Sequence, residues 1–254
     1  MLLSSMTWEE VSELDRDLIT VIPFGAIEQH SYHLPLGTDS FIVEGIALEL
    51  EKRIPHQVCL LPTTFLGCSR HHMAFAGSLT ARTATFINIG EELVESMARH
   101  GFRRFLLLNG HGGNIEKISI AAENVSYFPG LQLQAIAVTY WHLIQKEIRA
   151  VRETPLGGMG HACELETSLM LLLRPELVHR ERMRPGGLQR GTRFTSGDMF
   201  DSGSVTLTKS FEEISSHGGL GDPTTASSEK GRVILDLIVN KLIELVGEVR
   251  SGTL

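Results

Sequence analysis

The chain has 254 residues, of which 42% are hydrophobic and 21% are charged. This composition is ordinary for a soluble globular protein, and the length allows one large α/β domain with a substantial core. The net charge of −7 argues against general binding to nucleic-acid phosphates, because that binding requires a basic surface.

Short apolar runs alternate with longer amphipathic segments along the chain. Strands are predicted over residues 18–24, 58–64, 104–109 and 131–140, and helices over 40–53, 83–100, 115–127, 162–173 and 226–249. Strands separated by helix-length crossovers indicate a parallel sheet covered on both faces. The region 185–221 is rich in Gly, Ser and Thr and is expected to form long loops and short strands. No domain boundary is evident, so a single domain over 1–254 is predicted.

The three cysteines, Cys59, Cys68 and Cys163, include no close-spaced pair. Such a set is neither a disulfide framework nor a cysteine-type zinc site, so a cytoplasmic location is expected. No N-terminal segment has the pattern of a signal peptide, and no apolar run approaches the ~20 residues needed to cross a bilayer. We therefore expect neither a membrane partner nor a nucleic-acid partner.

Polar side chains and glycines are concentrated directly after the first and third predicted strands. Residues 25–39 (GAIEQHSYHLPLGTD) follow the first strand, and residues 109–114 (NGHGGN) follow the third. In open parallel sheets, ligands bind beyond the carboxyl ends of the strands. We therefore expect both segments to face the same crevice.

Four residues of these two segments form a candidate metal site: Glu28, His30, Asp39 and His111. Mixed nitrogen and oxygen ligands suit Zn²⁺, Mn²⁺ or Fe²⁺, whereas cages made only of oxygen suit Mg²⁺ or Ca²⁺. Each residue alone has an ordinary explanation, such as Asp39 capping the helix that follows it. Their joint placement at two adjacent strand ends favours one or two divalent metal ions.

Five segments in this order resemble the creatininase (creatinine amidohydrolase) family: EQHSYHLPLGTD, LLLNGHGGN, TYWHLI, HACELETSLMLLLRPELV and GDPTTASSEKG. The resemblance covers nearly the whole chain. It implies a three-layer αβα sandwich with a mainly parallel central sheet, and a homo-oligomer that is often a hexamer. It also implies a one- or two-metal centre that hydrolyses a C–N bond of a small-molecule substrate, such as a cyclic amide, a formamide or a peptide.

The same resemblance implies a role for each candidate ligand. Glu28 and His111 would hold one ion. His30 would help to hold a second ion, and Asp39 would bridge the two.

One ligand of the creatininase pattern is missing from this chain. Creatininase itself has a glutamate two residues after the matched histidine, whereas this chain has Gly113 there, as in the NGHGGN branch of the family. Either Glu166 or Glu164 substitutes, or only one ion binds firmly. For Glu164 we expect exposure to solvent.

His161 and Glu166 are the candidates for proton transfer. His161 follows a glycine-rich stretch (LGGMG), and Glu166 comes five residues later in a predicted helix. An imidazole near a helix N-terminus has a lowered pKa, which favours the neutral form that accepts a proton. A bound ion would lower the pKa of a water molecule towards ~7, and His161 or Glu166 would move a proton to the departing nitrogen.

Five further residues are candidates for contact with the substrate. Gly112 and Gly113 could offer backbone N–H groups to a developing oxyanion. In the segment 67–80, His72 is a more plausible substrate contact than His71. Tyr140 and Trp141 could form an apolar wall at the end of the fourth strand, although core packing is an alternative for both.

A second departure from the creatininase pattern concerns the substrate pocket. Trp141 matches one of two tryptophans associated with that pocket, whereas Gly157 stands where the other is expected. Glycine leaves open space where an indole would cover a small flat ring. We therefore expect a substrate larger or more polar than creatinine.

Three alternatives to amide hydrolysis remain. A metal-dependent hydrolase, lyase or isomerase of a ring derived from a sugar or polyol could use the same scaffold, because an ion can activate water or substrate alike. A nucleotide-binding module is a weaker alternative, since GHGGN has neither the GxGxxG pattern nor the lysine of a Walker motif. A metal-holding protein without activity is the third.

Overall fold

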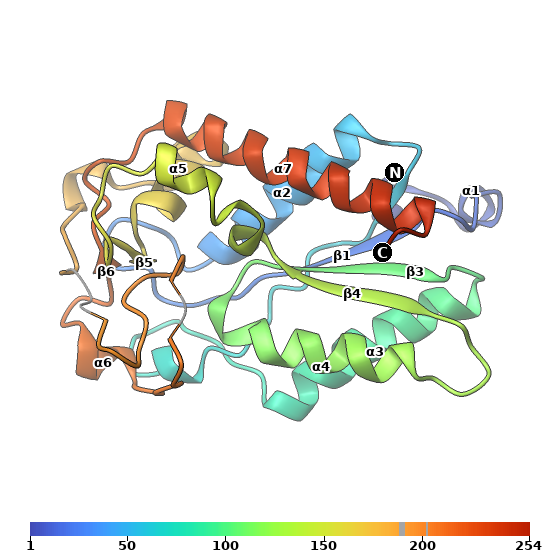
Figure 1. The fold of residues 1–254 in the computed structure, drawn as a ribbon, viewed down its shortest axis with the longest axis horizontal. Helices are drawn as coiled ribbons and strands as arrows, with labels where there is room; N and C mark the ends of the chain where they lie inside the picture. Colours follow the sequence, from blue (N-terminus) through green and yellow to red (C-terminus); the bar gives the residue numbers. More distant parts are fainter. Residues whose placement is uncertain (188–190, 202) are drawn as a thin grey trace.

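The computed structural model describes residues 1–187, 191–201 and 203–254. Its centre is a four-stranded parallel sheet with the strand order β2-β1-β3-β4 (Figure 1). The strands are β1 (Ile19–Phe24), β2 (Val58–Leu60), β3 (Arg104–Asn109) and β4 (Gln134–Thr139). The predicted parallel sheet is confirmed, but β2 is shorter than predicted, because Pro62 has no N–H to donate to a strand ladder.

Helices cover both faces of this sheet (Figure 1). One face carries α2 (Thr38–Arg53), α5 (Glu164–Leu173) and α7 (Ser228–Ser251), and the other carries α3 (Thr83–Arg99) and α4 (Ile115–Ser126). The three layers confirm the predicted αβα sandwich.

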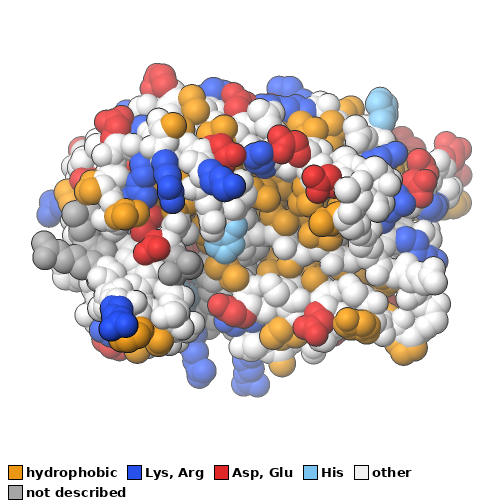
Figure 2. All heavy atoms as spheres, viewed as in Figure 1, with side chains coloured by type: hydrophobic (Ala, Val, Ile, Leu, Met, Phe, Trp, Pro, Cys, Tyr) orange, Lys and Arg blue, Asp and Glu red, His pale blue; other side chains and the backbone are white. Residues whose placement is uncertain are grey.

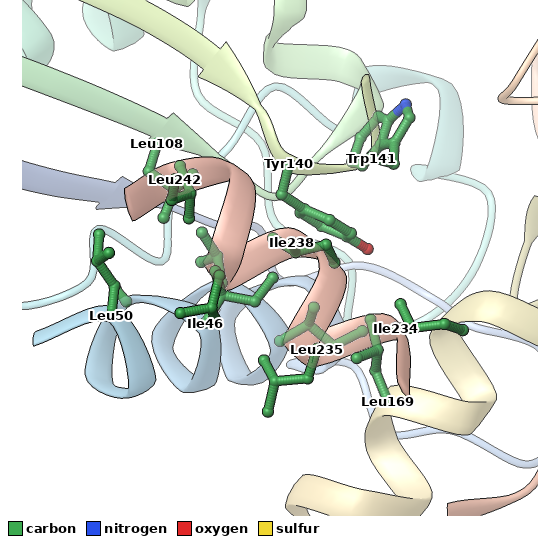
Figure 3. Packing of buried hydrophobic residues seen from close by; sticks show 14 of the residues in the cluster. Ile46, Leu50, Leu108, Tyr140, Trp141, Leu169, Ile234, Leu235, Ile238 and Leu242 are labelled. Carbon is green, nitrogen blue, oxygen red and sulfur yellow. The ribbon is translucent and has the colours of Figure 1, made fainter. Parts of the chain in front are cut away.

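Side chains of the central strands alternate between the two faces. In β3, Leu106 and Leu108 belong to the core shared with α2, α5 and α7, while Phe105 and Leu107 belong to the core shared with α3 and α4. This two-residue period explains why a strand buried on both sides reads as one apolar run, FLLL within RFLLLN. Figure 3 shows the first core, in which Leu108 faces side chains from α2 and α7.

Smaller elements lie at the end of the molecule where the parallel strands terminate (Figure 1). They include an antiparallel pair, β5 (Met159–His161) with β6 (Leu220–Gly221), and the short helix α6 (Phe211–Ile214). The first α-helix is α1 (Trp8–Ser12). Short 3-10 helices occur at Leu3–Ser5, Arg70–His72, Gly112–Asn114, Tyr140–Ile144, Glu147–Ala150, Pro175–Leu177 and Arg180–Arg182.

In the described residues of 185–221 the predicted loops and short strands are confirmed, the strand being β6, whereas the short helix α6 was not predicted. For residues 188–190 and 202 the prediction lies outside the described residues. Within the part of the chain that the structure describes, no helix combines the length and apolar character needed to cross a membrane.

The closing helix α7 approaches α5 closely at one glycine. A Cβ atom at Gly231 would lie 2.1 Å from the carbonyl oxygen of Ser168 and 3.2 Å from the Cβ of Leu172. The two helix backbones therefore meet with no room for a methyl group. This contact holds α5 in place, and the first turn of α5 carries Glu166.

We predict that Gly231→Ala lowers the free energy of unfolding by about 1–3 kcal/mol, because the two helices must separate to admit the methyl group. The matched control is Gly247→Ala in the same helix, where a Cβ would meet no atom within 4 Å. There, alanine should raise stability by roughly 0.5–1 kcal/mol, since it is the better helix former. Urea unfolding measures both variants, and equal effects would show that the close contact with α5 has no energetic importance.

Candidate metal centre

Two asparagines shape the site: Asn109 fixes the backbone of the loop after β3, and Asn114 joins that loop to the loop after β1. The side chain of Asn109 accepts the backbone N–H of His111 at 3.1 Å and donates to the carbonyl oxygen of the same residue at 2.8 Å. Asn114 donates to the carbonyl oxygen of Gly25 at 3.1 Å and accepts the N–H of Cys68 at 2.9 Å. The segments that follow the two strands therefore share one edge of the sheet, as predicted.

The four residues predicted as metal ligands meet at this edge, and all are buried. Asp39 lies between two histidines: its Oδ1 is 3.2 Å from Nε2 of His30, and its Oδ2 is 3.0 Å from Nδ1 of His111. Glu28 approaches from the other side, with its Oε2 3.3 Å from Nε2 of His111. The carboxylate of Asp39 thus occupies the middle of the cluster.

Glu166 extends this cluster towards α5. Its Oε1 is 3.8 Å from Nε2 of His30. Ligand atoms of His30, Asp39 and Glu166 all lie within 4.8 Å of one another, a spacing at which they could hold one ion. Two further groups have the same spacing: Glu28 with His30 and His161, and Glu28 with His71 and His111.

Three atoms of the cluster are buried without a hydrogen-bond partner among the described residues: Oε2 of Glu28, Nε2 of His30 and Oδ2 of Asp39. Buried polar atoms are mostly paired, because an unpaired one costs about 1–3 kcal/mol. These three come from two carboxylates and an imidazole, the mixed donor set that suits Zn²⁺, Mn²⁺ or Fe²⁺. The residues present therefore fit a divalent metal ion.

Burial and mutual attraction set the charges in the cluster. Burial raises the pKa of Glu28 to about 7, against the attraction of His111. Burial would also raise the pKa of Asp39, but His30 and His111 outweigh it and hold that pKa well below its usual range. Burial lowers the pKa of His111, yet Glu28 and Asp39 raise it to about 9. The carboxylates thus require positive charge beside them, which protonated histidines or a divalent ion can supply.

His161 faces the cluster from β5. Its Nε2 lies 2.7 Å from the carbonyl oxygen of Gln29, so Nε2 carries the proton and Nδ1 faces Glu28, whose Oε1 is 3.8 Å away. Burial, reinforced by His30, holds the pKa of His161 well below its usual range. The neutral imidazole agrees with the prediction, but the cause differs, because α5 begins later, at Glu164.

His72 lies behind Glu28 and positions it. Its Nε2 is 3.2 Å from Oε1 of Glu28, and its Nδ1 is 2.8 Å from the amide nitrogen of Gln29. With the Gln29 amide donating to Nδ1, the Nε2–H of His72 points to the carboxylate. One face of the ring also stacks on Phe211, with centroids 4.0 Å apart. Contact between His72 and substrate stays a prediction.

A cavity of about 360 Å³ opens onto the cluster. The predicted site residues that line it are Glu28, Asp39, His72, His111, Gly112, Trp141, His161 and Glu166. It is also lined by residues that the sequence analysis did not single out: Ser196, Asp198, Met199, Asp201 and Phe211. No sequence signal marks them, because they belong to a loop-rich region that only the fold brings to the site, with Phe211 at the start of its short helix α6. Gln29 was also missed, although its place between two predicted ligands could have indicated it.

Two of the predicted substrate contacts, Tyr140 and Gly113, do not line the cavity of the metal centre. Tyr140 is 1% exposed and belongs to the core beneath α7, where its ring points toward Ile238 while Trp141 extends away (Figure 3). Core packing, the alternative considered for both aromatic residues, therefore describes Tyr140. Gly113 lines a neighbouring cavity instead.

Gly113 has no room for a side chain. A Cβ atom there would lie 2.3 Å from the carbonyl oxygen of Cys68 and 2.4 Å from Nε2 of His111. The position where creatininase carries its additional glutamate is therefore closed in this chain. A substitute ligand has to come from another element, and Glu166 is the carboxylate that faces His30.

The expectation that Glu164 is exposed is wrong. Its side chain is fully buried and accepts the N–H groups of Glu153 at 2.9 Å and Thr154 at 3.0 Å. The ammonium group of Lys230 in α7 also donates to it. Residues two apart on a helix face different directions, so Glu164 ties α5 to its neighbours while Glu166 faces the centre.

The sequence matches the creatininase family, described as creatinine amidohydrolase, over residues 4–246. It is 26% identical to creatinine amidohydrolase of Pseudomonas putida, over 96% of this chain and 95% of that protein. It is 31% identical to the mycofactocin precursor peptide peptidase of Mycobacterium tuberculosis, over 89% of this chain and 83% of that protein. It is 27% identical to the 3-dehydro-scyllo-inosose hydrolase of Thermotoga maritima, over 96% of this chain and 82% of that protein.

The fold is also similar to a solved structure. The structure named "Creatininase Mn" has a TM-score of 0.81 and 25% sequence identity, with 97% of each chain covered. Sequence and structure thus agree over nearly the whole length of the chain. The chain therefore belongs to the creatininase family, as its five sequence segments predict.

Proposed function

We propose that this protein holds two divalent ions that share Asp39 as a ligand. Glu28 and His111 complete one ion site, and His30 and Glu166 complete the other. The observation that supports this arrangement is the position of Asp39, whose two carboxylate oxygens lie 3.2 Å and 3.0 Å from different histidines. The donor set favours Zn²⁺, Mn²⁺ or Fe²⁺.

As a member of the creatininase family, the protein is a metal-dependent amidohydrolase that acts on carbon–nitrogen bonds. Bound ions of this kind supply a water molecule of lowered pKa and polarise a carbonyl group. The chain's own residues bind and orient the substrate and move the proton. We propose a small cyclic amide, a formamide or a short peptide as the substrate.

His161 is the residue that we assign to proton transfer. Its Nε2–H is fixed by the carbonyl oxygen of Gln29 at 2.7 Å, and its lowered pKa keeps the ring neutral. Nδ1 can therefore accept a proton and deliver it to the departing nitrogen. Gly112 could offer its N–H to the developing oxyanion, and Trp141 forms an apolar wall of the same cavity.

A second candidate function is hydrolysis of a ring derived from a sugar or polyol. The similarity to the 3-dehydro-scyllo-inosose hydrolase of Thermotoga maritima favours it. The polar side chains of Ser196, Asp198 and Asp201 in the cavity wall suit hydroxyl groups of such a ring. Product analysis separates the two reactions, because amide hydrolysis releases an amine and ring hydrolysis of a cyclic ketone does not.

We also propose that the protein acts in the cytoplasm as a single domain over 1–254 and forms a homo-oligomer, with a hexamer as the expected form. The three free, buried cysteines suit a reducing compartment. A closed ring or a dihedral assembly would satisfy the symmetry that most oligomers obey.

Asp39→Ala should remove more bound metal than any other single ligand substitution, because it takes a ligand from both ions. Elemental analysis after dialysis should find both ions lost, whereas Glu166→Gln should keep the ion held by Glu28 and His111. The matched control is Asp201→Asn, since Asp201 lines the same cavity outside the cluster. Full metal occupancy in Asp39→Ala would contradict the shared ligand.

The substitutions Glu166→Gln and Glu164→Gln should affect different properties: the first should lower activity, and the second should lower stability. Glu166→Gln should lower turnover by roughly 10–100-fold or more, because the ion held by His30 and Glu166 loses a ligand. The thermal unfolding midpoint should change little. Glu164→Gln should lower the free energy of unfolding by about 3 kcal/mol, because Lys230 loses a buried counter-charge. Its folded fraction should keep its metal. Thermal unfolding and activity per bound ion measure the contrast, and a fully active Glu166→Gln enzyme would leave Glu166 a structural role alone.

Creatinine should be a poor substrate with any of the three metals. Gly157 stands where the creatininase pattern has a tryptophan, and its φ of 90° disfavours any side chain there. Its N–H donates to Asp198 at 2.9 Å, so the backbone is held in this conformation. Creatinine hydrolysis by protein reloaded with Zn²⁺, Mn²⁺ or Fe²⁺ should stay far below the ordinary range of ~1–10³ s⁻¹. Turnover within that range would refute the prediction.

A further inference from the structure

Gln29 lies in the chain between two of the proposed metal ligands, and its side chain is buried beside them. Its amide nitrogen is 2.8 Å from Nδ1 of His72 and 2.9 Å from the carbonyl oxygen of Gly218. Its amide oxygen accepts the backbone N–H of Ser31 at 2.9 Å. The side chain therefore joins the loop after β1 to a segment 189 residues further along the chain.

These contacts allow only one orientation of the Gln29 amide. The NH₂ group has two hydrogens, and Nδ1 of His72 and the carbonyl oxygen of Gly218 accept one each. Turning the amide over would place its oxygen against the oxygen of Gly218 and its nitrogen against the N–H of Ser31. Gly218 therefore determines that a donor faces Nδ1 of His72. The ring then keeps its own proton on Nε2, which lies 3.2 Å from Oε1 of Glu28.

The backbone of Gln29 fixes a second imidazole. Its carbonyl oxygen accepts the Nε2–H of His161 at 2.7 Å, so the approach of that nitrogen to the amide nitrogen, at 3.2 Å, is a contact between two donors. Nδ1 of His161 lies 3.8 Å from Oε1 of Glu28, the same oxygen that His72 approaches. One residue thus orients both rings beside this carboxylate oxygen.

Gly218 belongs to a segment that covers these rings, and we call residues 211–219 the covering segment. It begins with α6 and ends directly before β6 (Figure 1). Phe211 at its start stacks on His72 with ring centroids 4.0 Å apart, and its ring is edge-on to His161 at 4.8 Å. Figure 2 shows only small areas of histidine on the visible face of the molecule, in agreement with the burial of both imidazoles.

The two ends of the covering segment are tied to each other. The N–H of Ser215 donates to the carbonyl oxygen of Phe211 at 2.8 Å, and its hydroxyl donates to that of Gly219 at 2.7 Å. Gly218 itself has a φ of 82°, and a Cβ there would lie 1.8 Å from Oε1 of Gln29. The close approach to Gln29 therefore requires glycine at this position.

We propose that Gln29 is a positioning residue that makes the hydrogen bond from His72 to Glu28 depend on the seating of the covering segment. With the segment in place, the carbonyl oxygen of Gly218 orients the amide of Gln29, and the amide holds the ring of His72. The ring in turn holds Oε1 of Glu28, while Oε2, which has no hydrogen-bond partner among the described residues, stays available to an ion. The inference rests on the proposed metal centre, because Glu28 is one of its ligands.

Gln29→Met tests the contact with His72. Methionine has nearly the same length but no N–H, so Nδ1 of His72 loses its donor. Zinc affinity, measured by competition with a chelating dye, should fall about 10–100-fold, as is common when the partner of a metal ligand is lost. The ¹⁵N resonance of Nδ1 of His72, identified by its absence from His72→Gln, should also shift, which a general loss of stability would not cause. Parental zinc affinity in Gln29→Met would overturn the proposal.

Gly218→Ala tests the dependence on the covering segment and leaves Gln29 and His72 unchanged. Its methyl group should push the carbonyl oxygen away from the amide, weaken zinc binding about tenfold or more and shift the same ¹⁵N resonance. The matched control is Gly130→Ala, where φ is 75° but a Cβ would meet no described atom within 4 Å. This control should change neither property, and thermal unfolding checks that both variants fold. Equal losses in the two variants would assign the effect to backbone strain and overturn the proposal.

The double variant Gln29→Met/Gly218→Ala shows whether the covering segment acts through Gln29. If it does, the double variant should bind zinc as Gln29→Met does, because the amide on which Gly218 acts is already absent. Losses that add would mean that the two residues act independently, and the dependence on the covering segment would be wrong.

The same measurements separate this inference from the proposed function. If the parent and both single variants bind zinc equally well, the metal centre stands and the positioning role of Gln29 is refuted. If the parent binds no zinc, but the ¹⁵N resonance of His72 still shifts in Gln29→Met and in Gly218→Ala, the role of Gln29 is supported and the metal centre is refuted.

Discussion

Two carboxylates, Glu28 and Asp39, are buried together at the carboxyl edge of the sheet, and neither can stay ionised there without positive charge nearby. Burial removes the water that would stabilise them, at a cost that is large for an unpaired charge. The imidazoles of His30 and His111 meet this requirement at 3.0–3.3 Å. The loops after β1 and β3 must therefore deliver acids and bases to the same small volume. The side chain of Asn114 joins the two loops, and that of Asn109 fixes the backbone of His111.

The layers of the fold serve this arrangement in different ways. The parallel sheet brings two loops to one edge, while the contact between α5 and α7 sets the position of the helix that carries Glu166. Within α5, two carboxylates have separate tasks: Glu164 joins the helix to Lys230 in α7, and Glu166 faces His30. The irregular segment before β6 then covers the site from the remaining side, with Phe211 against the ring of His72.

Periodicity and the rule that ligands lie beyond strand ends were enough to predict the three layers and to bring Glu28, Asp39 and His111 together. These signals are local or follow from topology. The exposure expected for Glu164 was wrong because its partner, Lys230, lies in a helix far along the chain. Phe211 could not be predicted for a similar reason: it begins the short helix α6 within a loop-rich region, and nothing in the sequence of that region shows where its side chains will lie. A sequence pattern indicates which residues carry chemistry more readily than which residues enclose it.

Gly113 also constrains how members of the family can evolve into one another. Gaining the glutamate of creatininase would take more than a codon change, because the first side-chain atom would overlap Cys68 and His111. The loop would have to move before the new ligand could be tolerated, and that movement would carry an imidazole away from the centre. A protein that exchanges one ligand set for the other during evolution would therefore lose its metal site at an intermediate stage, unless another carboxylate already lies beside the ions. Glu166 already faces His30 and could serve as that carboxylate. The helix α5, which carries Glu166, is therefore the element that would allow the exchange to evolve.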